Sequence, residues 1–199
     1  MTDQKTPVLL TAFNQVTWLR RMVDDLTASG VATPIIVDNA STYPGLLEYL
    51  DSSPCQVIRH TRNAGPRVAW ENEEAAEITR AGYYVVTDSD LGLSSVDIPA
   101  ALADCRRALD RGPELIKAGL SLRVNDLPTT AIGNRAADWE RQFWCRKSRT
   151  RSPRGHRAAI DTTFALYRPG TGWGGYSPAW RSEHSARHEP WYQIGRAHV

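Results

Sequence analysis

The sequence predicts an α/β protein in which helices flank a doubly wound, mostly parallel sheet. In the first half of the chain, short apolar runs alternate with segments of helical periodicity, and the connections between them are short. This alternation is typical of parallel βαβ units. Hydrophobic residues make up 41% of the 199 residues, enough for the sizeable core that such a sheet requires.

The first half contains four expected strands and three expected helices. The first helix carries apolar residues from Trp18 to Leu26 at helical spacing and stops at Gly30. Pro44 suits the first turn of the second helix, where a missing N–H costs little. The fourth strand starts at Tyr83 and ends in two carboxylates, Asp88 and Asp90. The other expected strands are 8–12, 34–37 and 56–59, and the expected helices are 16–27, 43–50 and 67–80.

The second half is less regular. Apolar periodicity predicts helices at 98–109 and 136–144 and strands at 115–124 and 160–167. The segment 169–180 is rich in Gly, Pro and Trp and is expected to be a loop.

Composition limits the classes of partner and compartment. The net charge of +2 is too small to favour a nucleic-acid partner. Cys55, Cys105 and Cys145 are widely spaced and odd in number, which favours a reducing compartment over a disulfide framework. Because residues 1–6 are polar and no apolar run approaches membrane-spanning length, we expect a cytoplasmic protein. Residues 194–199 resemble a translated sequencing adapter, so we expect the natural protein to continue beyond Gln193.

Polar residues follow three of the expected strands. Asp88 and Asp90 end the fourth strand, Asp38 ends the second, and Asn63 follows the third. Ligands of open α/β sheets bind beyond the carboxyl ends of the strands. Two carboxylates spaced i, i+2 at such an end suit one hard divalent cation, with open positions left for phosphate oxygens. The alternative is that Asp88, Asp90 and Asp38 cap turns and helices.

The first turn, 11–15, has no glycine, although a dinucleotide fold needs one there for its backbone to approach a pyrophosphate. Ordinary Rossmann oxidoreductases are therefore disfavoured. Later in the chain, Asp161 starts an apolar strand and is a candidate general base. His184 and His188 lie in a segment dense in Trp and Arg, where aromatic side chains between Trp173 and Tyr192 either stack on a sugar or belong to the core. A basic cluster from Arg146 to Arg157 is either a solvated loop or a phosphate-binding one.

Taken in order, these segments resemble the family-2-type glycosyltransferases of the GT-A fold, in a bacterial subgroup. The resemblance rests on Val-Asp-Asn-Ala-Ser at Asp38, Asn63-x-Gly65, Thr-Asp-Ser-Asp ending at Asp90, the segment starting at Asp161, and residues 186–192. It covers most of residues 7–192. It implies a single domain over residues 1–193, with a nucleotide-sugar-binding half at 1–92, and a smaller acceptor-side half at 93–193 that is expected to be incomplete.

The resemblance also implies roles for individual residues. Asp90 is the direct ligand of a Mn²⁺ or Mg²⁺ ion, Asp88 contacts the ribose, the sugar or the metal, and His188 completes the metal shell. Asp161 is the base of an inverting transfer, although Ile160 precedes it where many members carry a second acidic residue. The expected nucleotide-sugar-binding residues are Thr11, Ala12, Asn14, Asp38, Asn39, Asn63, Gly65, Arg67 and Asp88.

The implied reaction moves a sugar from a nucleoside-diphosphate sugar to an acceptor hydroxyl on a glycan, a lipid-linked molecule or a small molecule. A full-length protein of this kind could associate peripherally with a membrane. One alternative is a non-catalytic carbohydrate- or nucleotide-binding domain, or an inactive fragment. A sugar-phosphate nucleotidyltransferase is disfavoured because residues 11–15 lack its glycine-rich basic loop.

Overall fold

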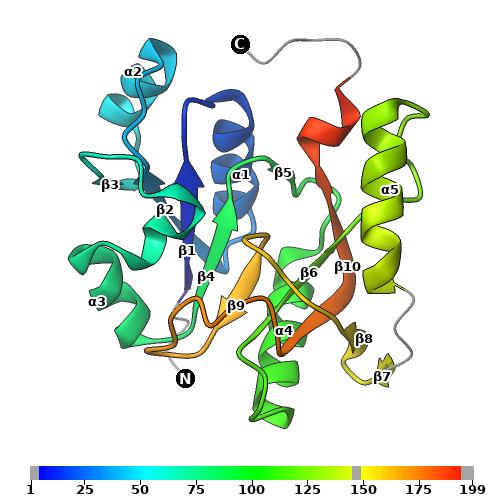
Figure 1. Ribbon diagram of the computed structural model, residues 1–199. Coiled ribbons are helices and arrows are strands. Elements are labelled where there is room, and N and C mark those ends of the chain that lie inside the picture. Colours follow the sequence, from blue (N-terminus) through cyan, green and yellow to red (C-terminus); the bar gives the residue numbers. More distant parts are fainter. Residues whose placement is uncertain (1–4, 145–148, 194–199) are drawn as a thin grey trace.

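The computed structural model describes residues 5–144 and 149–193 as an α/β fold built on one mixed, curled sheet (Figure 1). The strands are β1 (Thr6–Ala12), β2 (Ala32–Asp38), β3 (Gln56–Arg59), β4 (Tyr84–Asp88), β5 (Leu91–Gly92), β6 (Lys117–Leu122), β7 (Arg149–Arg151), β8 (Arg154–Arg157), β9 (Ala165–Tyr167) and β10 (Ala179–His188). The helices are α1 (Thr17–Ala28), α2 (Pro44–Ser52), α3 (Glu73–Ala81), α4 (Ile98–Arg111) and α5 (Ala131–Trp144), with 3₁₀ turns η1 (Gly65–Trp70) and η2 (Glu189–Tyr192).

The strand order along the sheet is β3-β2-β1-β4-β9-β6-β10-β8-β7, and β5 pairs separately with β10. Strands β1 to β4 are parallel, as predicted. Strand β9 runs antiparallel between β4 and β6, and β8 runs antiparallel to β10. The prediction of a mostly parallel sheet is therefore right for the first half and wrong for the second, where the sheet is mixed.

Alternating side chains of the central strands enter cores on opposite faces of the sheet. Val8 and Leu10 of β1 pack in a cluster that includes the buried faces of α1, α2 and α4. Leu9 packs in a second cluster with η1 and α3. Helix α5 lies on the same side as α3, at the other end of the sheet (Figure 1).

Several elements differ from the sequence prediction. Strands β5, β7 and β8 were not predicted, and α5 begins at Ala131 rather than at residue 136. The predicted helix 67–80 is divided into η1 and α3, because the Asn72 side chain caps the N–H groups of Glu74 and Ala75 at 2.9 and 3.2 Å and starts a new helix. The predicted strand 160–167 is reduced to β9, because Thr162 leaves the sheet to bond with Asp88. Strand β10 extends well beyond the predicted loop and was not predicted.

Strand β10 was not predicted because polar residues occupy several of its buried positions. Arg181 and Ser182 are both buried within the sheet. Polar partners satisfy them. Arg181 pairs with Glu140, the Ser182 hydroxyl oxygen accepts the His184 N–H at 2.9 Å, and the Ser182 carbonyl accepts the Ser121 hydroxyl at 2.6 Å. Hydrophobic periodicity does not detect a strand that is buried through such pairs.

Several predictions concern residues outside the described ranges. These are the adapter-like tail 194–199, Cys145, and Arg146 and Lys147 of the basic cluster. The rest of that cluster falls in the β7–β8 hairpin and its turn. Within residues 5–144 and 149–193, Cys55 and Cys105 are free thiols, and no helix combines the length and apolar character needed to cross a bilayer.

The close pairing of β6 with β9 depends on Gly119. A Cβ at this position would lie 2.2 Å from the Phe164 carbonyl oxygen and 2.9 Å from Ala165 Cα. We therefore expect Gly119→Ala to lower the free energy of unfolding by about 3 kcal/mol, because two paired strands must separate. Urea denaturation measures this. Gly172→Ala is the control, since nothing lies within 4 Å of its Cβ position, and equal effects of the two changes would contradict the packing described.

Candidate functional site

The carboxyl ends of β1, β2 and β4 meet at one edge of the sheet, as the sequence predicted. Thr11 lies opposite Asp88, and Ala12 lies opposite Asp38. Beyond these ends is an open cavity of about 380 Å³, which we call the outer cleft. Its lining residues are Thr11, Phe13, Gln15, Trp18, Asn39, Asn63, Gly65, Pro66, Asp88, Ser89, Asp90 and Pro190.

Asn39 organises one wall of the outer cleft. Its side-chain N–H groups donate to Asn63 Oδ1 at 3.0 Å and to the Gly65 carbonyl at 3.1 Å, and its Oδ1 accepts from the Ala64 N–H at 2.8 Å. Gly65 has φ of +75°, a conformation suited to glycine. Asn39, Asn63 and Gly65 thus form one hydrogen-bonded unit.

Other predicted nucleotide-binding residues have structural partners. Asn14 Oδ1 accepts the N–H groups of Thr42 and Tyr43 at 2.7 and 2.8 Å, so its side chain joins two loops. Asp38 is buried and accepts the Ser41 N–H at 3.1 Å within the loop before α2. The alternative that Asp38 caps this helix is wrong, because α2 begins after Tyr43 without a side-chain cap. Arg67 stacks its guanidinium on Trp173, with 4.2 Å to the ring centroid.

Asp90 and His188 form the second predicted group. Strand β10 ends by pairing with β5, which places His188 opposite Leu91 and next to Asp90. The two side chains approach at 3.6 Å between Asp90 Oδ2 and His188 Nε2. Burial raises the pKa of Asp90, and the neighbouring His188 partly opposes this shift. Burial lowers the pKa of His188, and the charge of Asp90 partly opposes that shift. Asp90 Oδ1 and His188 Nδ1 are buried and have no hydrogen-bond partner within the described part of the chain.

Asp88 has a different environment from Asp90. Its Oδ2 accepts the Thr162 hydroxyl at 2.7 Å, and its backbone N–H donates to the Thr162 carbonyl at 3.1 Å. Burial raises the pKa of Asp88 to about 7; Thr162 lowers it, and the charges of Asp90 and Asp161 raise it further. The Asp88 carboxyl is therefore close to half protonated near neutral pH.

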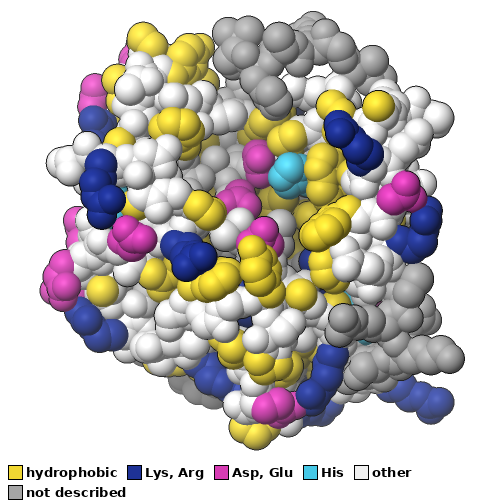
Figure 2. Space-filling view, viewed as in Figure 1, with side chains coloured by type: hydrophobic (Ala, Val, Ile, Leu, Met, Phe, Trp, Pro, Cys, Tyr) yellow, Lys and Arg dark blue, Asp and Glu magenta, His cyan; other side chains and the backbone are white. Residues whose placement is uncertain are grey.

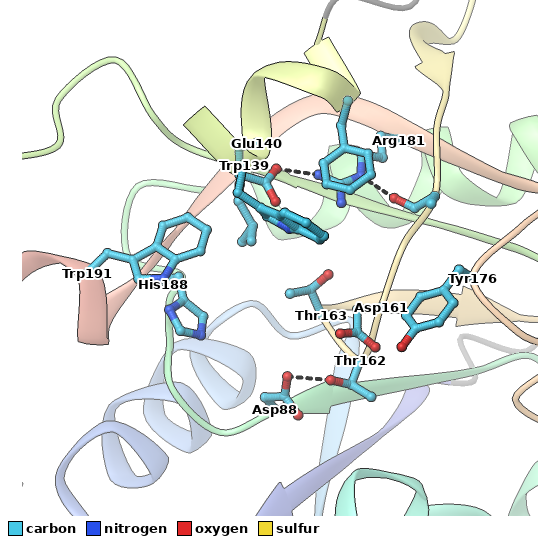
Figure 3. Close-up of a pocket in the computed structure, with 13 residues that line it drawn as sticks. Asp88, Trp139, Glu140, Asp161, Thr162, Thr163, Tyr176, Arg181, His188 and Trp191 are labelled. Atoms are coloured by element: carbon cyan, nitrogen blue, oxygen red, sulfur yellow. Dashed lines mark hydrogen bonds and ion pairs between the residues drawn. The ribbon is translucent and has the colours of Figure 1, made fainter. Parts of the chain in front are cut away.

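A second cavity, of about 180 Å³, lies on the other side of Asp88, and we call it the inner pocket (Figure 3). Figure 2 shows the corresponding hollow, with acidic side chains and a histidine inside it and hydrophobic side chains along its rim. The lining residues are Asp88, Leu122, Trp139, Glu140, Phe143, Ala159, Asp161, Thr162, Thr163, Tyr176, Arg181, His188 and Trp191. Asp88 lines both cavities.

Aromatic side chains provide much of the inner pocket's wall. Trp139 and Tyr176 are 63% and 55% exposed, which is unusual for such large apolar groups. Trp191 packs against His188, with ring centroids 4.6 Å apart. Of the aromatic residues that the sequence singled out, Tyr176 and Trp191 line this pocket, whereas Trp180 belongs to the core.

A buried ion pair holds α5 in place beside the inner pocket. Arg181 Nη1 bonds Glu140 Oε2 at 2.6 Å, and both side chains are almost fully buried. Arg181 also donates to the Ala159 carbonyl at 2.7 Å and lies over the Phe143 ring at 4.3 Å. The two charges of the pair offset each other, and Asp88 and Asp161 are the other acidic side chains that line the pocket.

The structure adds residues that sequence reasoning missed, namely Thr162, Glu140, Arg181 and Trp139. Thr162 follows the predicted base Asp161, whose exposed carboxylate lines the inner pocket. A threonine gives no sequence signal of its own. Glu140 and Arg181 are 41 residues apart, and only the fold brings them together.

The three predicted metal ligands do not form one cluster. Asp90 and His188 are paired, whereas Asp88 bonds to Thr162. Among the described residues, no three His, Cys, Asp or Glu side chains gather as a metal-binding group. In comparisons with known proteins, no family model matches the chain and no curated protein has a similar sequence.

Asp88 should make stability depend on pH. Its folded pKa of about 7 lies above the ordinary 3.8, so the folded state binds the proton more tightly than the unfolded state. The stability from this group is complete below about pH 4 and is lost as the pH rises through 7. We expect Asp88→Asn to raise the free energy of unfolding at pH 8 by about 4 kcal/mol and to change it little at pH 4.

Thermal melts at both pH values, without divalent ions, measure this effect. Asp110→Asn is the matched control, because this carboxylate is half-exposed and pairs with Arg106 on the surface of α4. A gain in stability at pH 8 no larger than that of the control would contradict the buried environment of Asp88.

Proposed function

We propose that this protein is a metal-dependent glycosyltransferase of the GT-A fold, which transfers a sugar from a nucleoside-diphosphate sugar to an acceptor hydroxyl with inversion. The observation that carries this proposal is the pair of cavities that meet at Asp88. A group-transfer enzyme with two substrates needs two binding sites that share one reacting point. Here the outer cleft takes the nucleotide and its diphosphate, and the inner pocket takes the acceptor.

The position of the outer cleft supports nucleotide binding. It lies beyond the carboxyl ends of parallel strands, where α/β sheets bind their ligands. Its polar groups include the Asn39–Asn63–Gly65 unit and Thr11, whose buried hydroxyl oxygen has no partner in the described part of the chain. A buried polar atom without a partner is costly. A nucleotide in the cleft would supply the missing hydrogen bond.

Asp90 and His188 fit a divalent ion as a carboxylate and imidazole pair. Each carries a buried polar atom without a described partner, and both atom types bind Mn²⁺. Two protein donors leave further positions for diphosphate oxygens and water. When bound, the ion would neutralise negative charge on the leaving nucleoside diphosphate.

Asp161 is the proposed base, because its carboxylate is exposed inside the inner pocket. It removes the proton from the acceptor hydroxyl while the hydroxyl oxygen bonds to the anomeric carbon. The bond from that carbon to the diphosphate oxygen breaks, and the electron pair leaves with the diphosphate. Trp139, Tyr176 and Trp191 offer flat apolar faces for a sugar ring.

Removal of Asp90 should weaken metal-dependent nucleotide binding. We expect Asp90→Ala to weaken binding of the preferred nucleotide among UDP, GDP and dTDP at least tenfold in the presence of Mn²⁺, because one of two protein donors is lost. Isothermal titration measures this. Asp51→Ala on the surface of α2 is the control, since Asp51 is exposed and pairs with exposed Arg59. The proposal fails if the wild type binds none of these nucleotides and Asp90→Ala changes nothing.

Trp139 should affect the acceptor and leave the donor unaffected. We expect Trp139→Ala to raise the acceptor KM about tenfold, because an apolar face for the sugar is lost, while hydrolysis of the donor without acceptor is unchanged. Ile132→Ala is the matched control, an exposed apolar residue on the same helix outside the pocket. An equal loss of donor hydrolysis and transfer in Trp139→Ala would rule out the acceptor assignment. Binding of donor without any turnover by the wild type would favour a non-catalytic domain.

A further inference from the structure

Lys117, at the start of β6, is a fully buried lysine that bonds the backbone of Asp161, one of the residues lining the inner pocket. Its Nζ donates to the Asp161 carbonyl at 3.1 Å and to the Tyr167 hydroxyl at 3.3 Å. Both partners are uncharged. Lysine is almost never fully buried in this way, so the structure must compensate the ammonium group by other means.

Aromatic rings supply part of this compensation. Nζ lies 5.5 Å from the ring centroid of Tyr167 and 5.6 Å from that of Trp173, within range of cation–π attraction. Tyr167 in turn stacks on Tyr84, with centroids 5.3 Å apart and an interplanar angle of 12°. The rings fix the position of the ammonium, so it presents its N–H groups to a defined point of the backbone.

That point is the turn that carries the proposed base. Lys117 binds the carbonyl of Asp161, and the next residue, Thr162, binds Asp88 through its hydroxyl and its backbone carbonyl. The turn is therefore held at Asp161 by Lys117 and at Thr162 by Asp88. Asp161 itself has an exposed side chain, so its direction depends on its backbone.

We propose that Lys117 is a positioning residue, whose ammonium fixes the Asp161–Thr162 turn and so aims the Asp161 carboxylate into the inner pocket. The inference rests on the proposed function for its catalytic consequence, but the ordering of the turn can be measured independently. Lys117 touches neither cavity; it acts only through the carbonyl of Asp161.

The charge on Lys117 should make this ordering depend on pH. Burial lowers its pKa to about 8; the neighbouring Asp161 opposes the shift, and Arg181 adds to it. The other groups facing it are Tyr167 and, across the Trp173 ring, Arg67. Because the folded pKa lies below the ordinary 10.5, protonated Lys117 costs stability at pH 7. Loss of the ammonium should loosen the turn, because the charged hydrogen bond to the Asp161 carbonyl is lost. It should not destabilise the fold, because the cost of burying the charge is removed as well.

The first test needs no substrate. Hydrogen exchange measured by mass spectrometry should show faster exchange across residues 158–164 in Lys117→Met than in the wild type, with a melting temperature at pH 7 that is not lower. The matched control is Tyr84→Phe, which removes a hydroxyl that bonds Thr171 and Trp70 in the same aromatic group without touching Lys117. This control should leave exchange at 158–164 unchanged.

The wild type alone provides a second measurement, which remains decisive if Lys117→Met does not fold. Only three lysines occur in the sequence, so NMR of ¹³C-labelled lysine gives a tractable titration. One lysine should titrate near pH 8, and exchange across 158–164, corrected for its intrinsic pH dependence, should rise in the same interval. A lysine that titrates near 8 with unchanged exchange at the turn would overturn the proposal.

With a donor and an acceptor in hand, Lys117→Met should lower kcat about 10- to 100-fold while the donor KM changes less than threefold, since misplacement of a reacting group by about 1 Å has costs of this size. The wild-type kcat should fall above pH 8. Unchanged exchange and unchanged kcat in Lys117→Met would refute the positioning role. If the wild type turns over no donor, the proposed transferase fails, and the exchange experiments still decide the role of Lys117.

Discussion

The two hydrogen bonds between Asp88 and Thr162 connect the two halves of the protein at the point where the candidate site lies. Strand β4 belongs to the parallel half, and Thr162 belongs to the segment that enters β9, the antiparallel strand between β4 and β6. Because of this contact β9 begins only at Ala165, and residues 161–164 form a turn before it.

The site concentrates polar groups that are expensive to bury. Burial raises the pKa values of Asp88, Asp90 and Glu140 and lowers that of Lys117. Glu140 is matched by Arg181, and Lys117 by a carbonyl, a hydroxyl and aromatic faces. Asp88 is only partly compensated. Clusters of shifted groups of this kind are typical of functional sites, although structural ion-pair networks such as Glu140–Arg181 also produce them.

The sequence predicted the first half of the fold well, because Val8 to Leu10 and similar apolar runs form parallel strands by local pattern alone. The polar ends at Asp38, Asn63 and Asp88 were predicted to share an edge for the same reason. Strand β10 could not be predicted, since Arg181 and Ser182 are buried through partners far away in sequence. The antiparallel direction of β9 could not be predicted either. The direction of a strand in a sheet is set by its pairing partners, and the sequence of a three-residue strand does not indicate it.

Within the candidate site, sequence reasoning proposed Asp90 and His188 together, and the pairing of β5 with β10 brings them to 3.6 Å. Asn14 was proposed as a nucleotide contact, but its side-chain oxygen accepts hydrogen bonds from the backbone N–H groups of residues 42 and 43. A short polar side chain beside a strand end serves a ligand or a neighbouring loop equally well. Only the fold decides between these roles, because the second loop comes from a distant part of the chain.

The asparagine side chains that join the loops around the outer cleft have a further thermodynamic consequence. Asn14 connects the loop after β1 to the start of α2, and Asn39 holds residues 63–65. The conformational entropy of these loops is thus lost during folding, so ordering them does not weaken the binding of a ligand. A cleft built in this way behaves as a rigid receptor where these loops line it, so ligand association there should be limited by diffusion and desolvation rather than by loop ordering.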